Sequence, residues 1–176
     1  MGYEMKRRIL WITETAAMLA LLIVLQGVTK PLGQIVTGSC VNAVLAVAIL
    51  LGGLWCGLTV ALVSPFCAFL LGIGPQLIAI IPAIALGNVG FVLLLHFIYD
   101  KKRCRGILAW LGAALGKFLI LYFVVVQLLC RVLPLKQPQI DTFTAMFSTP
   151  QLVTALIGGG LALLIVPILK KALRRN

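Results

Sequence analysis

The sequence predicts an all-α integral membrane protein, a compact bundle of about six transmembrane helices. Two observations carry this prediction. First, 62% of the 176 residues are hydrophobic and only 11% are charged, with a mean hydropathy of +1.15. A soluble domain typically carries about 25% charged residues, so this chain has too few to cover a water-facing surface. Second, the apolar residues gather in long runs without alternation at period two, which favours helices over a membrane β-barrel.

Six apolar runs follow one another along the chain, and each has about the 20 residues that a helix needs to cross roughly 30 Å of hydrocarbon. The runs cover residues 9–28, 36–52, 54–73, 76–98, 107–129 and 151–169. Glycines predict tight turns at Gly52-Gly53 and at Gly72-Ile73-Gly74-Pro75. No linker or repeat divides the runs, so we expect a single domain over residues 1–176.

The basic residues predict the orientation of this bundle. The chain has 15 Lys and Arg residues against 4 Asp and Glu residues, a formal net charge of +11. If the N-terminus is cytoplasmic, most of the basic residues fall on inner segments, at 6–8, 101–105 and 170–175. Lys30, Arg131 and Lys136 then lie outside. The positive-inside rule therefore places both termini in the cytoplasm. Membrane orientation accounts for the basic excess, and we expect no nucleic-acid partner.

Polar side chains inside apolar runs are costly in lipid, so each is a candidate for a functional site. In the predicted topology they gather in the outer half of the bundle. The substrate-binding candidates are Gln34, Asn42, Gln76, Asn88, Lys117, Gln127 and Thr154. Lys117 lies near the middle of its run and needs an anionic ligand, a structural contact to Asn88 or to carbonyls, or a path for snorkelling to water.

The outer connection 134–150 contains a second candidate feature. Phe143, Met146 and Phe147 have the i, i+3, i+4 spacing of a short amphipathic helix. Such a helix either anchors the chain at the outer membrane surface or forms a lid over an outward-facing pocket.

Motifs of catalysis are absent from the sequence. There is no acid pair, HExxH or GxSxG, and the stretch GAALGKF lacks the Walker spacing. An intramembrane enzyme using Lys117, His96 or Glu14 is disfavoured because these residues belong to different depths. The five cysteines show no CxxC spacing and suit small apolar fillers. We therefore expect neither an ATPase nor a hydrolase, and no metal site or cofactor.

Ala16 and Ala20 give the first run a small-residue face on which another helix can pack closely, either within the bundle or from a partner. This face belongs to the stretch ETAAMLALLIVL. The chain also contains VNAVLAVAILLGGLWCGLTVAL, GKFLILY and PQLVTALIGGG in this order. Together these stretches resemble the substrate-binding S component of energy-coupling-factor (ECF) vitamin transporters, and the resemblance covers nearly the whole chain.

The resemblance implies a prokaryotic plasma-membrane protein that takes part in vitamin uptake. It implies that Ala16 and Ala20 face a membrane-embedded T subunit, which joins two cytoplasmic ATPases that supply the energy. It also implies a site for a small vitamin-like molecule in the outer half, built from the last three helices and capped by outer loops. A stand-alone secondary carrier and a non-transport membrane scaffold remain the alternative functions.

Overall fold

The computed structural model of the chain describes residues 2–99 and 103–173. All regular secondary structure in this part is helical, and it contains no strand. Within it, five helices are long and apolar enough to cross a membrane. They cover Glu4–Leu32, Gln34–Leu70, Ile78–Ile98, Gly106–Val132 and Gln137–Ala172. The predicted all-α class is confirmed, and the helices suit a multi-pass membrane protein.

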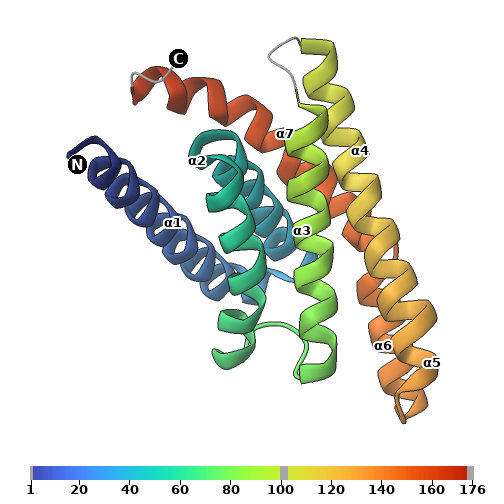
Figure 1. Cartoon of the computed structure of the whole chain (residues 1–176). Helices are drawn as coiled ribbons and strands as arrows, with labels where there is room; N and C mark the ends of the chain where they lie inside the picture. Colours follow the sequence, from blue (N-terminus) through green and yellow to red (C-terminus); the bar gives the residue numbers. More distant parts are fainter. Residues whose placement is uncertain (1, 100–102, 174–176) are drawn as a thin grey trace.

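The helices follow one another with short connections (Figure 1). In chain order they are α1 (Gly2–Thr29), α2 (Gln34–Leu70), α3 (Ile81–Ile98), α4 (Arg103–Leu121), α5 (Cys130–Val132), α6 (Gln137–Phe147) and α7 (Thr149–Ala172). Short 3₁₀ turns, Lys30–Leu32 and Ile78–Ile80, precede α2 and α3. A π-helical segment, Tyr122–Leu129, joins α4 to α5.

The helix α2 consists of two helical arms that meet at Gly53. This residue has φ 82° and ψ −177°, which is not helical. A residue with a Cβ disfavours left-handed backbone by about 1–2 kcal/mol, so glycine suits the bend. Figure 1 shows both arms running downward from this point. The bend coincides with the predicted boundary between the second and third apolar runs.

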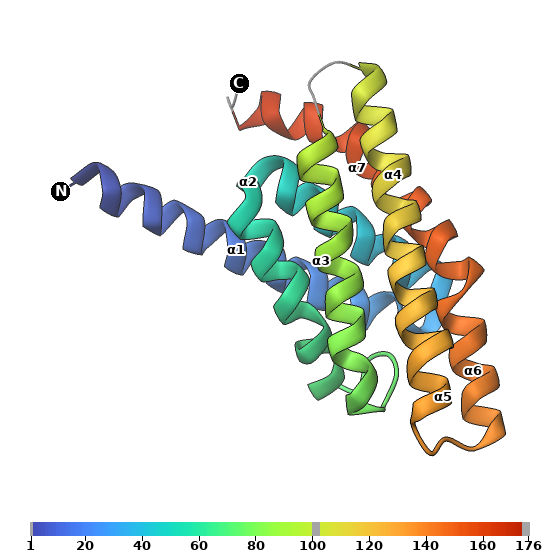
Figure 2. The same ribbon diagram turned by 45° about the vertical axis from the view of Figure 1, so that its right-hand side comes forward.

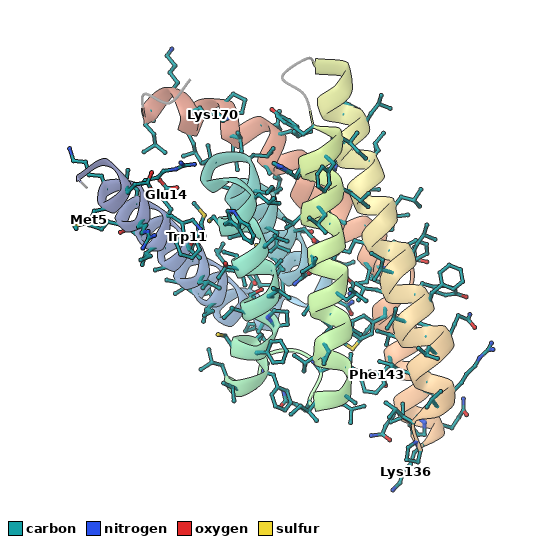
Figure 3. The ribbon with its side chains drawn as sticks, in the orientation of Figure 1. Met5, Trp11, Glu14, Lys136, Phe143 and Lys170 are labelled. Carbon is teal, nitrogen blue, oxygen red and sulfur yellow. The ribbon has the colours of Figure 1, made fainter. Side chains whose placement is uncertain are left out.

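Two apolar clusters hold the bundle together. The larger one joins both arms of α2 to α3, α4 and α7, and α1 adds the fully buried Leu22. The smaller one surrounds α6, where Phe143 and Phe147 pack with Leu121 and Val125. Figure 3 shows Phe143 on α6, near the π-helical segment. The amphipathic helix predicted within 134–150 is thus confirmed as α6, and its apolar face packs on the bundle.

The helix α1 lies at one side of the bundle, and its N-terminal part leans away from the other helices (Figures 1 and 2). Only 11% of its apolar window is buried, compared with 50% for the span that contains α3. Ala16 and Ala20 are both exposed. The small-residue face is therefore not used for packing within the described part of the chain.

The start of α1 and the end of α7 lie at the same end of the molecule, together with the end of α3 and the start of α4 (Figure 1). The connection between α5 and α6 lies at the opposite end, as does Lys136 (Figure 3). Several residues of the predicted inner basic segments fall outside the described residues, namely Lys101, Lys102, Arg174 and Arg175.

Candidate functional site

A cavity of about 350 Å³ opens between the end of α1, both arms of α2, α3, α4 and the junction of α6 with α7. This volume falls within the roughly 300–1,000 Å³ that small-molecule sites typically have. Polar side chains contributed by five helices or their ends line it together with apolar ones. The polar lining residues are Gln26, Lys30, Gln34, Thr37, Asn42, Ser64, Asn88, Lys117 and Gln151.

Lys117 is the buried cation of this cavity, with a relative exposure of 3%. Its Nζ donates hydrogen bonds to Asn42 Oδ1 and to Asn88 Oδ1, each at 2.7 Å. The same Nζ lies 5.8 Å from the centre of the Phe91 ring, within the range of a cation–π contact. Lys117 thus ties α4 to the first arm of α2 and to α3.

The amide of Asn42 is held so that its oxygen faces the lysine. Its Nδ2 donates to the carbonyl oxygen of Gly38 at 2.9 Å and to Thr154 Oγ1 at 3.3 Å. The Thr154 hydroxyl in turn donates to the carbonyl of Gln151 at 3.1 Å. Since both donors on the nitrogen side have acceptors, the network assigns the oxygen to Lys117. A chain of hydrogen bonds therefore connects Lys117 to the start of α7.

Close approach of α2 and α7 makes this chain of hydrogen bonds possible. A Cβ added at Gly158 would collide with the backbone oxygen of Ser39 and lie 2.7 Å from Asn42 Cβ. A Cβ added at Gly38 would lie 2.8 Å from Thr154 Cγ2. Glycine on each helix lets the two backbones come near enough for Asn42 to reach Thr154.

Three side-chain contacts to backbone carbonyls join the segments around the opening of the cavity. Lys30 Nζ donates to the carbonyl of Gly72 at 2.7 Å, which connects the end of α1 to the end of α2. Gln34 Nε2 and Gln151 Nε2 both donate to the carbonyl of Met146, at 2.6 and 3.1 Å. These two bonds fasten the end of α6 to α2 and α7 beside the cavity.

Two buried polar atoms on the cavity wall have no hydrogen-bond partner among the described residues. They are Gln26 Oε1 and Ser64 Oγ, and Ser64 is only 1% exposed. A buried polar group without a partner costs about 1–3 kcal/mol. Both atoms are therefore available to a polar ligand. Ser64 is not among the candidates selected from the sequence, although a hydroxyl in an apolar run is the signal that marks it.

The structure gathers four of the seven predicted substrate-binding residues on the cavity wall: Gln34, Asn42, Asn88 and Lys117. Thr154 is buried behind Asn42 and supports it without lining the cavity. The other two lie elsewhere. Gln76 is exposed and donates to the carbonyl of Gly74 at 3.3 Å, while Gln127 donates to the Tyr122 hydroxyl at 2.9 Å.

The three residues considered for an intramembrane enzyme are not brought together. Lys117 lines the cavity described above, whereas Glu14 lines separate hollows between α1 and the bend of α2. His96 is exposed and stands edge-on to Phe97, with the ring centres 5.3 Å apart. The described residues also hold no group of three or more His, Cys, Asp or Glu side chains that could bind a metal ion.

The chain matches no protein-family model, no curated protein and no solved structure.

Proposed function

We propose that this chain is the S component of an ECF-type importer, a membrane subunit that captures a small vitamin-like molecule from outside the cell. The cavity around Lys117 carries this proposal. It combines an apolar wall with a few convergent polar groups, the combination typical of small-molecule sites. Polar and ionisable groups inside membrane spans are expensive and commonly mark a ligand path.

The proposed topology has six crossings, with each arm of α2 crossing the cell membrane once. Both termini are then cytoplasmic, and the connection between α5 and α6 is outside. This assignment rests on the positive-inside rule, because Lys170 and Lys171 end α7 while Lys6, Arg7 and Arg8 begin α1. The cavity then opens in the outer half, where a ligand arrives.

The proposed partner is a T subunit that binds α1 and joins two cytoplasmic ATPases. Supporting this role, the small-residue face of Ala16 and Ala20 is exposed and lies on a helix that leans away from the bundle (Figure 2). Small residues let a second helix approach closely in lipid, where van der Waals packing drives association. Energy for transport comes from the ATPases, and this chain supplies selectivity.

The proposed partnership is tested by co-expressing the tagged full chain with an ECF T subunit and its ATPases and measuring their co-purification. We expect the wild-type chain to retain all partners. Ala16→Trp combined with Ala20→Trp should abolish retention, because two indoles block close helix approach. The matched control is Ala17→Trp, an exposed alanine of the same helix. Equal retention by the wild type and the double variant contradicts the assigned face, and no retention by the wild type favours a carrier or scaffold.

A further inference from the structure

The cavity holds a buried cation whose partners are neutral. We propose that its ligand is a small organic monoanion, a carboxylate whose charged group contacts Lys117. This inference deepens the proposed capture role, on which it rests, by naming the chemical class of the ligand.

The first step is the balance of charge around Lys117. The whole chain has four acidic residues. Asp100 lies outside the described residues, and none of the other three lines the cavity. Glu4 and Glu14 line a separate hollow beside the bend of α2, and Asp141 lies exposed on α6, where Gln137 donates to it. Lys117 therefore meets only the amide oxygens of Asn42 and Asn88 and the Phe91 ring among the described residues. The amide dipoles of Asn42 and Asn88 orient toward this cation, but no opposite charge among the described residues balances it.

The second step is the number of donors. A lysine ammonium has three N–H groups, and two of them go to Asn42 and Asn88. Because Lys117 also lines the cavity, the third N–H of its ammonium form is available to a ligand there. The Ser64 hydroxyl, which has no partner among the described residues, is a second donor that lines the same cavity. One ammonium and one hydroxyl suit the two oxygens of a carboxylate.

The third step concerns the net charge of the ligand and the apolar residues that line the rest of the cavity. A single buried cation balances a single negative charge, and a second one would be left uncompensated in a low-dielectric site. Lys30, the other cation of the lining, is exposed and bonded to Gly72, so it stands at the opening rather than at the buried end. Apolar residues, including Pro65, Ile81 and Phe147, complete the lining. The ligand is therefore an amphiphile with one acidic group.

Matched pairs of acids and amides test this inference without knowledge of the natural ligand. Butyrate and hexanoate are compared with butyramide and hexanamide on the purified full chain in lipid nanodiscs, at constant ionic strength. The apparent affinity is obtained from the shift in thermal unfolding temperature with probe concentration. We expect each acid to bind about tenfold or more tightly than its amide, as a charge-assisted hydrogen bond predicts.

Three variants show which residues produce the preference for acid over amide. Lys117→Met should remove the preference for acid, while Lys136→Met, an exposed lysine outside the cavity, should keep it. Since Lys117→Met leaves two amide oxygens without a donor and can unfold, Ser64→Ala provides a second variant. Its hydroxyl supports no other residue, so the chain should fold and bind the acids several-fold more weakly.

Equal binding of acid and amide by the wild type overturns the monoanion assignment and leaves a neutral capture site. An acid preference that persists in Ser64→Ala and Lys117→Met also overturns it, as does the absence of any shift with every probe. Failure of the wild type to retain a T subunit, measured separately, counts against the proposed function and leaves the acid preference intact.

Discussion

Lys117 is held by two asparagines that are far apart in sequence and lie on different helices. Its Nζ donates hydrogen bonds to Oδ1 of Asn42 and to Oδ1 of Asn88, both at 2.7 Å. Among the described residues, these two oxygens have no other hydrogen-bond donor. Burying a polar group in lipid is tolerated only when it is paired. The stability of the part of the bundle around the cavity therefore depends on this triad as well as on apolar packing.

The substitution Asn88→Leu removes one acceptor from Lys117 with little change in side-chain volume. We expect the free energy of unfolding to fall by about 1–3 kcal/mol, the cost of leaving a buried donor unpaired. Denaturant titration of the purified chain measures this change. Gln127→Leu is the matched control, because its amide bonds only Tyr122, away from the cavity. Equal destabilisation by both variants would contradict the importance of the triad.

Sequence patterns identified Lys117, Asn42 and Asn88 as candidates because polar residues are rare in apolar runs. The predicted alternative of a contact between Lys117 and Asn88 is confirmed. Patterns did not place Asn42 beside these two residues, since that contact depends on how α2, α3 and α4 pack. They placed Gln76 and Gln127 in the same group for the same reason, although neither side chain lines the cavity; Gln76 bonds to Gly74, which does. Ser64, the lining residue with an unpaired hydroxyl among the described residues, was not among the sequence candidates.

At the scale of elements, the crossing of α2 over α7 positions Asn42. Gly158 lies at the contact, where a Cβ would collide with the Ser39 backbone. The amphipathic pattern at 143–147 and the glycines at 52–53 predicted α6 and the bend of α2 from local signals. The π-helical segment Tyr122–Leu129 carries no comparable signal in the sequence, because an i→i+5 register is chosen by packing.

The substitution Gly158→Ala tests the crossing. We expect it to lower the unfolding free energy by about 1–3 kcal/mol, the usual cost of overpacking. Gly27→Ala is the control, because a Cβ there meets no atom within 4 Å, and the variant should unfold at the same denaturant concentration as the wild type or above it. A Gly158→Ala chain as stable as Gly27→Ala would show that α2 and α7 separate without cost.

The apolar face of α6 offers a second prediction at this scale. Phe147 is 2% exposed and packs on the π-helical segment, so Phe147→Ala should cost about 3–5 kcal/mol locally. We expect faster amide hydrogen exchange in α6 and unchanged exchange in α3. Phe123→Ala, at a ring that is 58% exposed, should leave both rates unchanged. Faster exchange across the whole bundle would mean that α6 does not open as a separate unit.

At the scale of the whole molecule, two lysines mark its opposite ends. Lys136 lies at the end with the α5–α6 connection, and Lys170 lies at the end with both termini (Figure 3). The basic residues that predict orientation lie in short segments of the sequence, which is why an orientation can be predicted without a structure. The complete wall of the cavity could not be predicted in this way, because it combines residues from six helices or their ends.

Labelling of single cysteines in intact cells tests the orientation. In a chain without its five natural cysteines, Lys136→Cys should react with a membrane-impermeant maleimide. Lys170→Cys should react only after the cells are opened, because the positive-inside rule places it in the cytoplasm. The reversed pattern of reactivity would place the cavity opening on the cytoplasmic side.

Capture of a small molecule in the cavity is the central claim, and mass spectrometry tests it most directly. The full chain is purified from cells in mild detergent and analysed intact, beside Ala68→Phe, which fills the cavity, and Ala17→Phe, which adds the same ring to the exposed side of α1. We predict a bound small molecule on the wild type and on Ala17→Phe, and none on folded Ala68→Phe. The same adduct on all three chains, or no adduct on any of them, would contradict capture in this cavity.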